Sequence, residues 1–185
     1  RGARHLPPRD WDHGRLRPRR VLPGAAAGRG GPAVALALGV RGDRAAQRGG
    51  GLREVRVHAP HHIEQRGMKW GVVTNKPAWL TEPLLDQLGL TPRAACIVSG
   101  DTTPQRKPHP APMLYACEKS GSNNSHCLYI GDAQRDIEAG KNAGMHTLVA
   151  LVGYIDATDQ PHLWNADAMI QHPREILEWI TARSV

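Results

Sequence analysis

Residues 128–136 of the chain, Leu-Tyr-Ile-Gly-Asp-Ala-Gln-Arg-Asp, decide the fold that the sequence predicts. The run from Cys127 to Ile130 is short, apolar and partly β-branched, which is typical of a buried strand. The strand ends at Gly131 and Asp132, and apolar residues at helical spacing follow. A strand that ends on an acid places a carboxylate at the carboxyl edge of a parallel sheet, where open α/β sheets bind their ligands.

A second acid follows Asp132 one helical turn later. Asp136 comes four residues on, so the first turn of the expected helix can return its carboxylate towards Asp132. Two carboxylates at one sheet edge suit Mg²⁺, which prefers oxygen ligands and usually keeps several waters. The alternative interpretation is an N-cap aspartate beside a surface aspartate, with no metal.

Two upstream stretches bring further polar groups to the same edge. Residues 70–77, Trp-Gly-Val-Val-Thr-Asn-Lys-Pro, form a second apolar strand that ends on the hydroxyl of Thr74 and the amide of Asn75. Residues 106–110, Arg-Lys-Pro-His-Pro, place Lys107 between a polar loop and a helix start marked by proline. Each side chain also has an ordinary structural explanation, as a helix cap, a turn residue and a surface lysine respectively.

In this order, the three stretches resemble the motifs of the haloacid dehalogenase-like (HAD) hydrolase superfamily. Thr74 resembles the hydroxyl of its second motif, Lys107 the lysine of the third, and Asp132 with Asp136 the acidic fourth. The amino-acid sequences of these motifs are similar to those of phosphoglycolate phosphatases and of the phosphatases that act on N-acetylmuramic acid 6-phosphate. The resemblance runs over residues 63–180, about two thirds of the chain.

The resemblance implies a Rossmann-like parallel sheet with helices on both faces, and a Mg²⁺-dependent phosphatase for a small phosphorylated metabolite. It implies that Asp132 binds the metal, and that Thr74, the backbone N–H of Asn75, and Lys107 bind the phosphate. Thr74, Lys107 and Asp136 are the implied catalytic residues, with Asp136 either ligating through water or pairing with Lys107. Such a site works by neutralising and aligning the phosphoryl group.

The resemblance does not extend to the first motif of the superfamily. HAD phosphatases carry an Asp-x-Asp pattern at the end of the first strand, and its first Asp is the nucleophile. The nearest match here is Asp10 with Asp12, but Pro7 and Pro8 precede it and argue against a central strand. We expect both acids to be incidental, the nucleophile to be unidentified, and the N-terminal strand and cap to be missing or disrupted.

The first sixty residues differ in composition from the rest. They hold 13 arginines, no lysine and four acids, whereas residues 61–185 hold 11 Lys+Arg against 13 Asp+Glu. The net charge of +7 therefore belongs to the N-terminal third. We divide the chain into a low-complexity segment, residues 1–62, and a HAD-like core, residues 63–185, and we expect packed structure to begin close to Ile63.

Three interpretations of residues 1–62 stay open. The segment is a disordered arginine-rich arm that binds nucleic acid, a low-complexity linker, or the product of a wrong reading frame in a GC-rich gene. The third is favoured because arginine, glycine, alanine and proline are what such codons give. It makes nucleic acid a disfavoured partner and leaves the phosphatase impaired in this chain. A HAD-fold protein that binds phosphate or a partner without catalysis is the leading rival.

The cysteines and the apolar runs bear on cellular location and on the expected strands and helices. The three cysteines follow no spacing pattern, which favours reduced thiols and a cytoplasmic protein. No signal peptide is visible, and even the apolar run 33–40 is too short to span a membrane, so no membrane partner is expected. Oligomeric state is not predicted.

Besides the strand at 127–130, periodicity predicts strands at 69–74, 95–98, 147–151 and 168–170, and helices at 78–88, 110–120 and 173–182.

Overall fold

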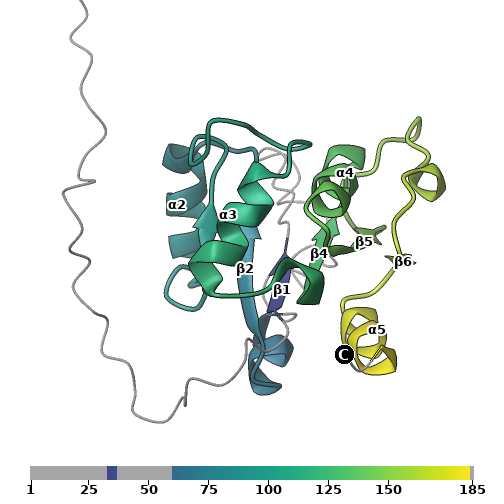
Figure 1. Cartoon of the computed structure of the whole chain (residues 1–185), viewed down its shortest axis with the longest axis horizontal. Coiled ribbons are helices and arrows are strands. Elements are labelled where there is room, and N and C mark those ends of the chain that lie inside the picture. The colour runs from purple at the N-terminus through teal and green to yellow at the C-terminus, as the bar shows by residue number, and fades with distance from the viewer. Residues whose placement is uncertain (1–32, 37–59, 184–185) are drawn as a thin grey trace, which may run out of the picture.

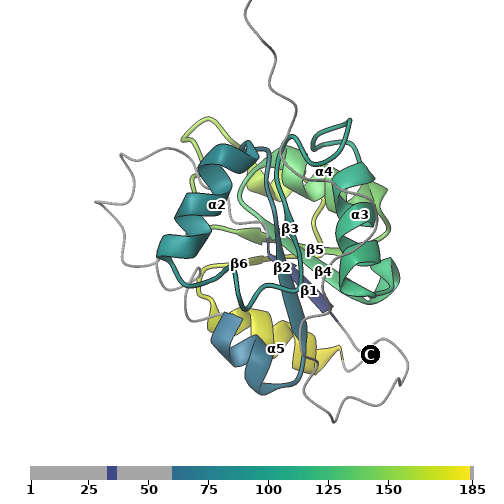
Figure 2. The same cartoon turned by 90° about the vertical axis from the view of Figure 1, so that its left-hand side faces the viewer.

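A single parallel sheet organises the computed structural model, which describes residues 33–36 and 60–183. Its strands run in the order β3-β2-β1-β4-β5-β6, and every neighbouring pair is parallel (Figure 1; β3 is labelled in Figure 2). The order reverses between β1 and β4, where ligands of open α/β sheets bind. The strands are β1 (Ala33–Leu36), β2 (Lys69–Val73), β3 (Ile97–Val98), β4 (Cys127–Gly131), β5 (His146–Ala150) and β6 (Ala168–Ile170).

Helices connect the strands and cover both faces of the sheet (Figure 2). The described α-helices are residues 60–65, α2 (Ala78–Gln87), α3 (Ala111–Ser120), α4 (Gln134–Asn142) and α5 (Arg174–Ala182), and two short 3₁₀ turns are η1 (Asn124–His126) and η2 (Pro161–Leu163). The predicted α/β fold with helices on both faces is therefore confirmed. None of the helices in the described residues has the length and hydrophobicity needed to cross a membrane.

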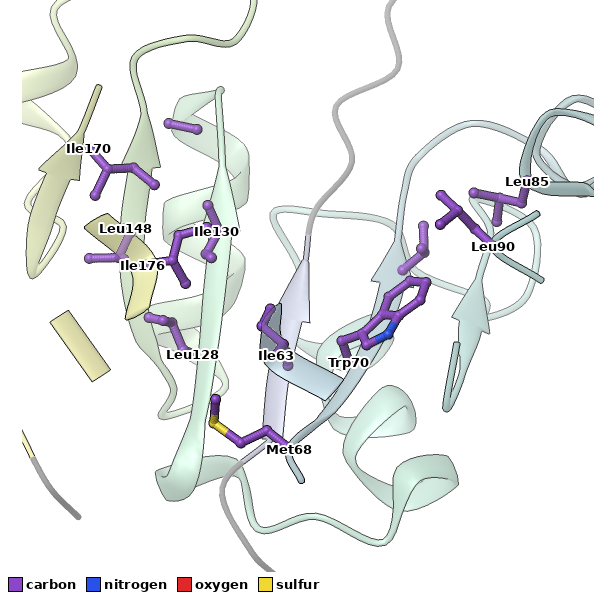
Figure 3. Packing of buried hydrophobic residues seen from close by; sticks show 12 residues of the cluster. Ile63, Met68, Trp70, Leu85, Leu90, Leu128, Ile130, Leu148, Ile170 and Ile176 are labelled. Carbon is purple, nitrogen blue, oxygen red and sulfur yellow. The ribbon is translucent and has the colours of Figure 1, made fainter. Parts of the chain in front are cut away.

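One face of the sheet packs against α2, α5 and the helical residues 60–65. Alternate strand residues point to this side because side chains in a strand have a period of two. Trp70 in β2 and Leu128 in β4 meet Ile63, Leu85 and other apolar side chains there (Figure 3). Its strand residues come from β2, β4, β5 and β6, so this layer extends across the described sheet.

The opposite face packs against α3 and α4. Val73 and Tyr129 occupy the odd positions of β2 and β4, and they lie against Met113 and Ala139 from these helices. The two helices follow the polar loop before Lys107 and the Asp132 turn respectively. Their packing on this face therefore fixes the start of each helix at the carboxyl edge of the sheet.

Strand β1 corrects the expectation that the N-terminal strand is missing or disrupted. Residues Ala33–Leu36 lie between β2 and β4, with Leu36 in register with Val72 and Ile130. A central parallel strand needs only a short continuous apolar run, which the composition of the surrounding segment concealed. Asp10 and Asp12 lie outside the described residues, so the structure does not place them.

Candidate active site

The end of β2 places the first two site residues at the carboxyl edge of the sheet. Thr74 is buried, and its backbone N–H donates to Val98 O in β3 at 2.8 Å. Its hydroxyl accepts a hydrogen bond from Lys76 N at 3.1 Å. The Thr74 side chain is thus held by the turn that leads into α2, with its oxygen at the edge of the sheet.

Asn75 fastens the loop that carries Lys107. Its Nδ2 donates to Lys107 O at 2.9 Å, and Lys107 N donates to its Oδ1 at 3.1 Å. The amide side chain is therefore committed to the Lys107 backbone. The phosphate contact that the resemblance implies uses the backbone N–H of Asn75, so it does not compete with this side-chain contact.

Lys107 is a buried ammonium surrounded by three oxygen atoms. Its Nζ lies 3.1 Å from Val73 O, 2.8 Å from the hydroxyl of Tyr129 and 2.7 Å from Asp136 Oδ1. Three oxygens match the three N–H groups of an ammonium. The position of the positive charge is therefore fixed by the protein.

Asp136 balances the charge of Lys107. The two side chains are 3% and 5% exposed respectively, so the pair is shielded from water. Apart from this ion pair, Asp136 Oδ1 has no hydrogen-bond partner among the described residues. Of the two roles open to Asp136 in the sequence, its contacts match the pairing with Lys107.

Tyr129 is a site residue that the sequence analysis missed. Its hydroxyl donates to Val73 O at 3.0 Å and accepts from Lys107 Nζ. Burial raises the pKa of the phenol well above its usual value, with the Asp136 and Asp132 charges adding to the effect, so the phenol stays neutral. A signal was present in the sequence, because a tyrosine inside a fully buried strand needs a partner for its hydroxyl.

Asp132 is the second carboxylate at this edge. It is 9% exposed, and its Oδ2 accepts from Tyr154 N at 2.9 Å. Burial raises its pKa; the Tyr154 N–H opposes this effect, the Asp136 charge adds to it and the Lys107 charge opposes it. No ion pair to Asp132 occurs among the described residues. Because Lys107 is already paired with Asp136, Asp132 is an excess negative charge that a cation would stabilise.

These contacts show how Mg²⁺ would fit. No group of three or more His, Cys, Asp or Glu side chains suited to a metal occurs in the described part of the chain. An all-protein cage is therefore not formed by these residues. Mg²⁺ is commonly held by one or two carboxylates, waters and substrate phosphate, and the buried, unpaired carboxylate of Asp132 is compatible with that mode.

The described site thus consists of a hydroxyl, an ammonium and two carboxylates at the carboxyl edge of a parallel α/β sheet. The family model described as haloacid dehalogenase-like hydrolase matches residues 58–150. The chain belongs to this family.

Two curated relatives illustrate the similarity within the family. The chain is 44% identical over 116 residues to a phosphoglycolate phosphatase of Xanthomonas campestris pv. campestris (strain 8004) and covers 52% of it. It is 44% identical over 116 residues to an N-acetylmuramic acid 6-phosphate phosphatase of Pseudomonas aeruginosa and covers 51% of it. Each match takes in 63% of this chain, which therefore spans about half the length of these relatives.

Solved structures agree on the fold. A predicted phosphoglycolate phosphatase from Haemophilus somnus 129pt aligns with a TM-score of 0.61 at 30% identity, over 66% of this chain and 54% of that one. A putative phosphoglycolate phosphatase from Lactobacillus delbrueckii subsp. bulgaricus aligns with a TM-score of 0.62 at 22% identity, over 68% and 52%. The second likeness, at its lower identity, concerns the fold alone.

Proposed function

We propose that this chain carries the core of a Mg²⁺-dependent phosphatase for a small phosphorylated metabolite, such as 2-phosphoglycolate or a sugar phosphate. The observation that supports it most is the buried Lys107 ammonium, which lies at the same sheet edge as the unpaired carboxylate of Asp132. Both lie within residues 58–150, which match the model of the haloacid dehalogenase-like hydrolase family.

The site residues divide the work by charge. Lys107 supplies a fixed positive charge towards the phosphoryl oxygens, and Asp136 and Tyr129 hold it in place. The Thr74 hydroxyl and the Asn75 backbone N–H donate hydrogen bonds to a phosphoryl oxygen as charge develops there. Mg²⁺ held by Asp132 would neutralise further charge and align the phosphate.

The attacking carboxylate is the part of this chemistry that the chain lacks in recognisable form. After β1 the sequence continues Ala-Leu-Gly-Val at residues 37–40, with no acid. This observation favours a second candidate function, in which the chain binds phosphate with Mg²⁺ but turns over little or no substrate.

We infer a cytoplasmic location from the cysteines, since those at 96, 117 and 127 are all free.

The test combines turnover and binding in the same protein. We expect little or no hydrolysis of a panel of phosphate monoesters, 2-phosphoglycolate and N-acetylmuramic acid 6-phosphate included, with or without Mg²⁺. Calorimetry should show inorganic phosphate binding that requires Mg²⁺ and is lost in Lys107→Met and Asp132→Asn. The matched control is Lys119→Met, which removes an exposed lysine on α3 and should leave binding unchanged.

Two outcomes would overturn this assignment. Phosphate binding that survives in both Lys107→Met and Asp132→Asn would move the site elsewhere. Robust turnover that Asp10→Asn abolishes would show that Asp10 and Asp12 form a working first motif. In that case the chain would be a competent enzyme, and the proposal of impaired catalysis would be wrong.

A further inference from the structure

The loop after β5 closes over Asp132 through a residue that has no side chain. A Cβ built on Gly153 would lie 2.2 Å from Asp132 Cβ and 2.7 Å from its Oδ2. Gly153 N donates to Ala150 O at 3.0 Å, which makes a tight turn directly after β5. The next residue, Tyr154, donates its backbone N–H to Asp132 Oδ2. Glycine is therefore needed here for space, because Asp132 occupies the volume that any side chain would take.

Two other glycines make room for site residues in the same way. A Cβ on Gly131 would lie 2.4 Å from Asp136 Cβ, and a Cβ on Gly100 would lie 2.2 Å from Asn75 O. Each glycine thus lies against a different residue of the candidate site. In the case of Gly153 the two partners are 21 residues apart in the sequence, so no local motif reveals the contact.

We propose that Gly153 and the Tyr154 backbone N–H are positioning elements that hold Oδ2 of Asp132 and leave its other oxygen for a divalent cation. This inference rests on the proposed function, in which Asp132 binds Mg²⁺. A carboxylate fixed by a neighbour loses less freedom when the cation binds, and it presents one oxygen in a set direction. Partners that orient a metal ligand are worth about 10- to 100-fold in metal affinity.

A methyl group at position 153 would disturb this arrangement in either of two ways. The clash with Asp132 Cβ must be relieved by moving the Asp132 side chain or the loop. Either movement separates Tyr154 N from Asp132 Oδ2. Gly153→Ala is therefore expected to weaken Mg²⁺ binding about 10- to 100-fold.

The experiment compares Gly153→Ala with a glycine-to-alanine variant that also introduces a clash, but away from the site residues. A Cβ on Gly71 would lie 2.5 Å from Cys96 Sγ and 2.9 Å from Cys96 O, and Cys96 is not a site residue, so Gly71→Ala is the control. Mg²⁺ affinity is measured by calorimetry in the presence of inorganic phosphate, with thermal unfolding as the check on stability. The expected result is about a 10- to 100-fold loss in Gly153→Ala and wild-type affinity in Gly71→Ala. Unchanged affinity in Gly153→Ala, or an equal loss in both variants, would overturn the proposal.

A second variant covers the case in which Gly153→Ala does not fold. Tyr154→Pro removes the N–H that binds Oδ2 and leaves Gly153 in place, because proline has no backbone donor. It should lower Mg²⁺ affinity as Gly153→Ala does. Wild-type affinity in a folded Tyr154→Pro protein would show that the N–H has no positioning role.

Failure of the proposed function would look different. If wild type and Asp132→Asn bind Mg²⁺ equally, Asp132 is not the metal ligand. The loop contact is then judged by hydrogen exchange of the Tyr154 amide, which needs no metal. Slow exchange in wild type and fast exchange in Gly153→Ala would support the contact between the Tyr154 N–H and Asp132, whereas equal rates would overturn it.

Discussion

Lys107 and Asp136 form a buried ion pair at the carboxyl edge of the sheet. Both side chains are buried, and the tyrosine hydroxyl beside them is itself tied to a backbone carbonyl of β2. Burying two charges costs a large desolvation free energy, which their attraction repays only with good geometry and further hydrogen bonds. The pair is therefore better explained by the need for a fixed positive charge at the sheet edge than by stability.

Breaking this pair should destabilise the protein strongly. Asp136→Asn leaves the Lys107 ammonium buried without a counter-charge, and we expect a loss of about 3–5 kcal/mol in the free energy of unfolding. Urea denaturation measures it. The control is Glu64→Gln at the half-exposed Glu64–Arg93 pair, where the two groups lie 2.8 Å apart and the expected loss is below about 1 kcal/mol. Equal stability of Asp136→Asn and wild type would show that Lys107 is neutral or rehydrated.

At the scale of elements, α3 joins the sheet through a layer that contains all three cysteines. Cys117 in α3 lies 3.7 Å from Cys127 at the start of β4, measured between their Sγ atoms. Cys96, just before β3, packs against the same cluster. The sequence showed no spacing pattern among them, because their proximity arises from the packing of a helix on two strands.

Cys96 should react slowly with alkylating agents at neutral pH. Burial raises the pKa of its thiol to about 11, and the neighbouring Cys117 adds to the effect. A raised pKa keeps the thiol protonated, so the reactive thiolate is scarce below pH 11 and grows about tenfold per pH unit. Iodoacetamide labelling from pH 7 to 10, followed by mass spectrometry of the peptide that contains Cys96, checks this in the wild-type protein. A rate that levels off below pH 9 would contradict it.

At the scale of the whole molecule, β1 connects the two halves of the sheet. It pairs with β2 on one side and β4 on the other, and no pairing of β2 with β4 replaces it among the described strands. The β2 side carries Thr74 and Asn75, and β4 carries Asp132. The relative placement of these groups therefore depends on four residues of the N-terminal third.

Deleting β1 should abolish the fold. A chain that starts at residue 60 lacks β1, so the edges of β2 and β4 that pair with it lose their hydrogen-bond partners. We expect this chain to aggregate or to lack a cooperative thermal transition. A chain that starts at residue 33 keeps β1 and is the control, expected to unfold cooperatively like the full protein. Circular dichroism during heating compares the three. A folded, cooperative chain from residue 60 would show that the sheet does not need β1.

The control chain also tests the nucleic-acid alternative, since it removes eight of the 13 arginines of residues 1–60 without removing the strand.

The type and order of the strands and α-helices from residue 69 onward could be predicted from the sequence alone. Strand and helix periodicities are local properties, so residues 69–73, 78–87 and 168–170 were placed within a residue or two of their observed bounds. The predicted strand at 95–98 shortened to Ile97–Val98, and that at 147–151 moved one residue earlier, because strand ends depend on which partner supplies hydrogen bonds.

Only the tertiary structure decided which groups meet. The Asn75 clamp on Lys107, the Tyr129 hydroxyl beside its ammonium and the Gly153 loop over Asp132 join segments between 21 and 32 residues apart. No sequence period encodes such contacts, since they follow from how helices and loops pack across parallel strands. The place of β1 between β2 and β4 has the same origin. Its four residues are too few to stand out by composition, and hydrogen bonds to both neighbours make them the middle of the sheet.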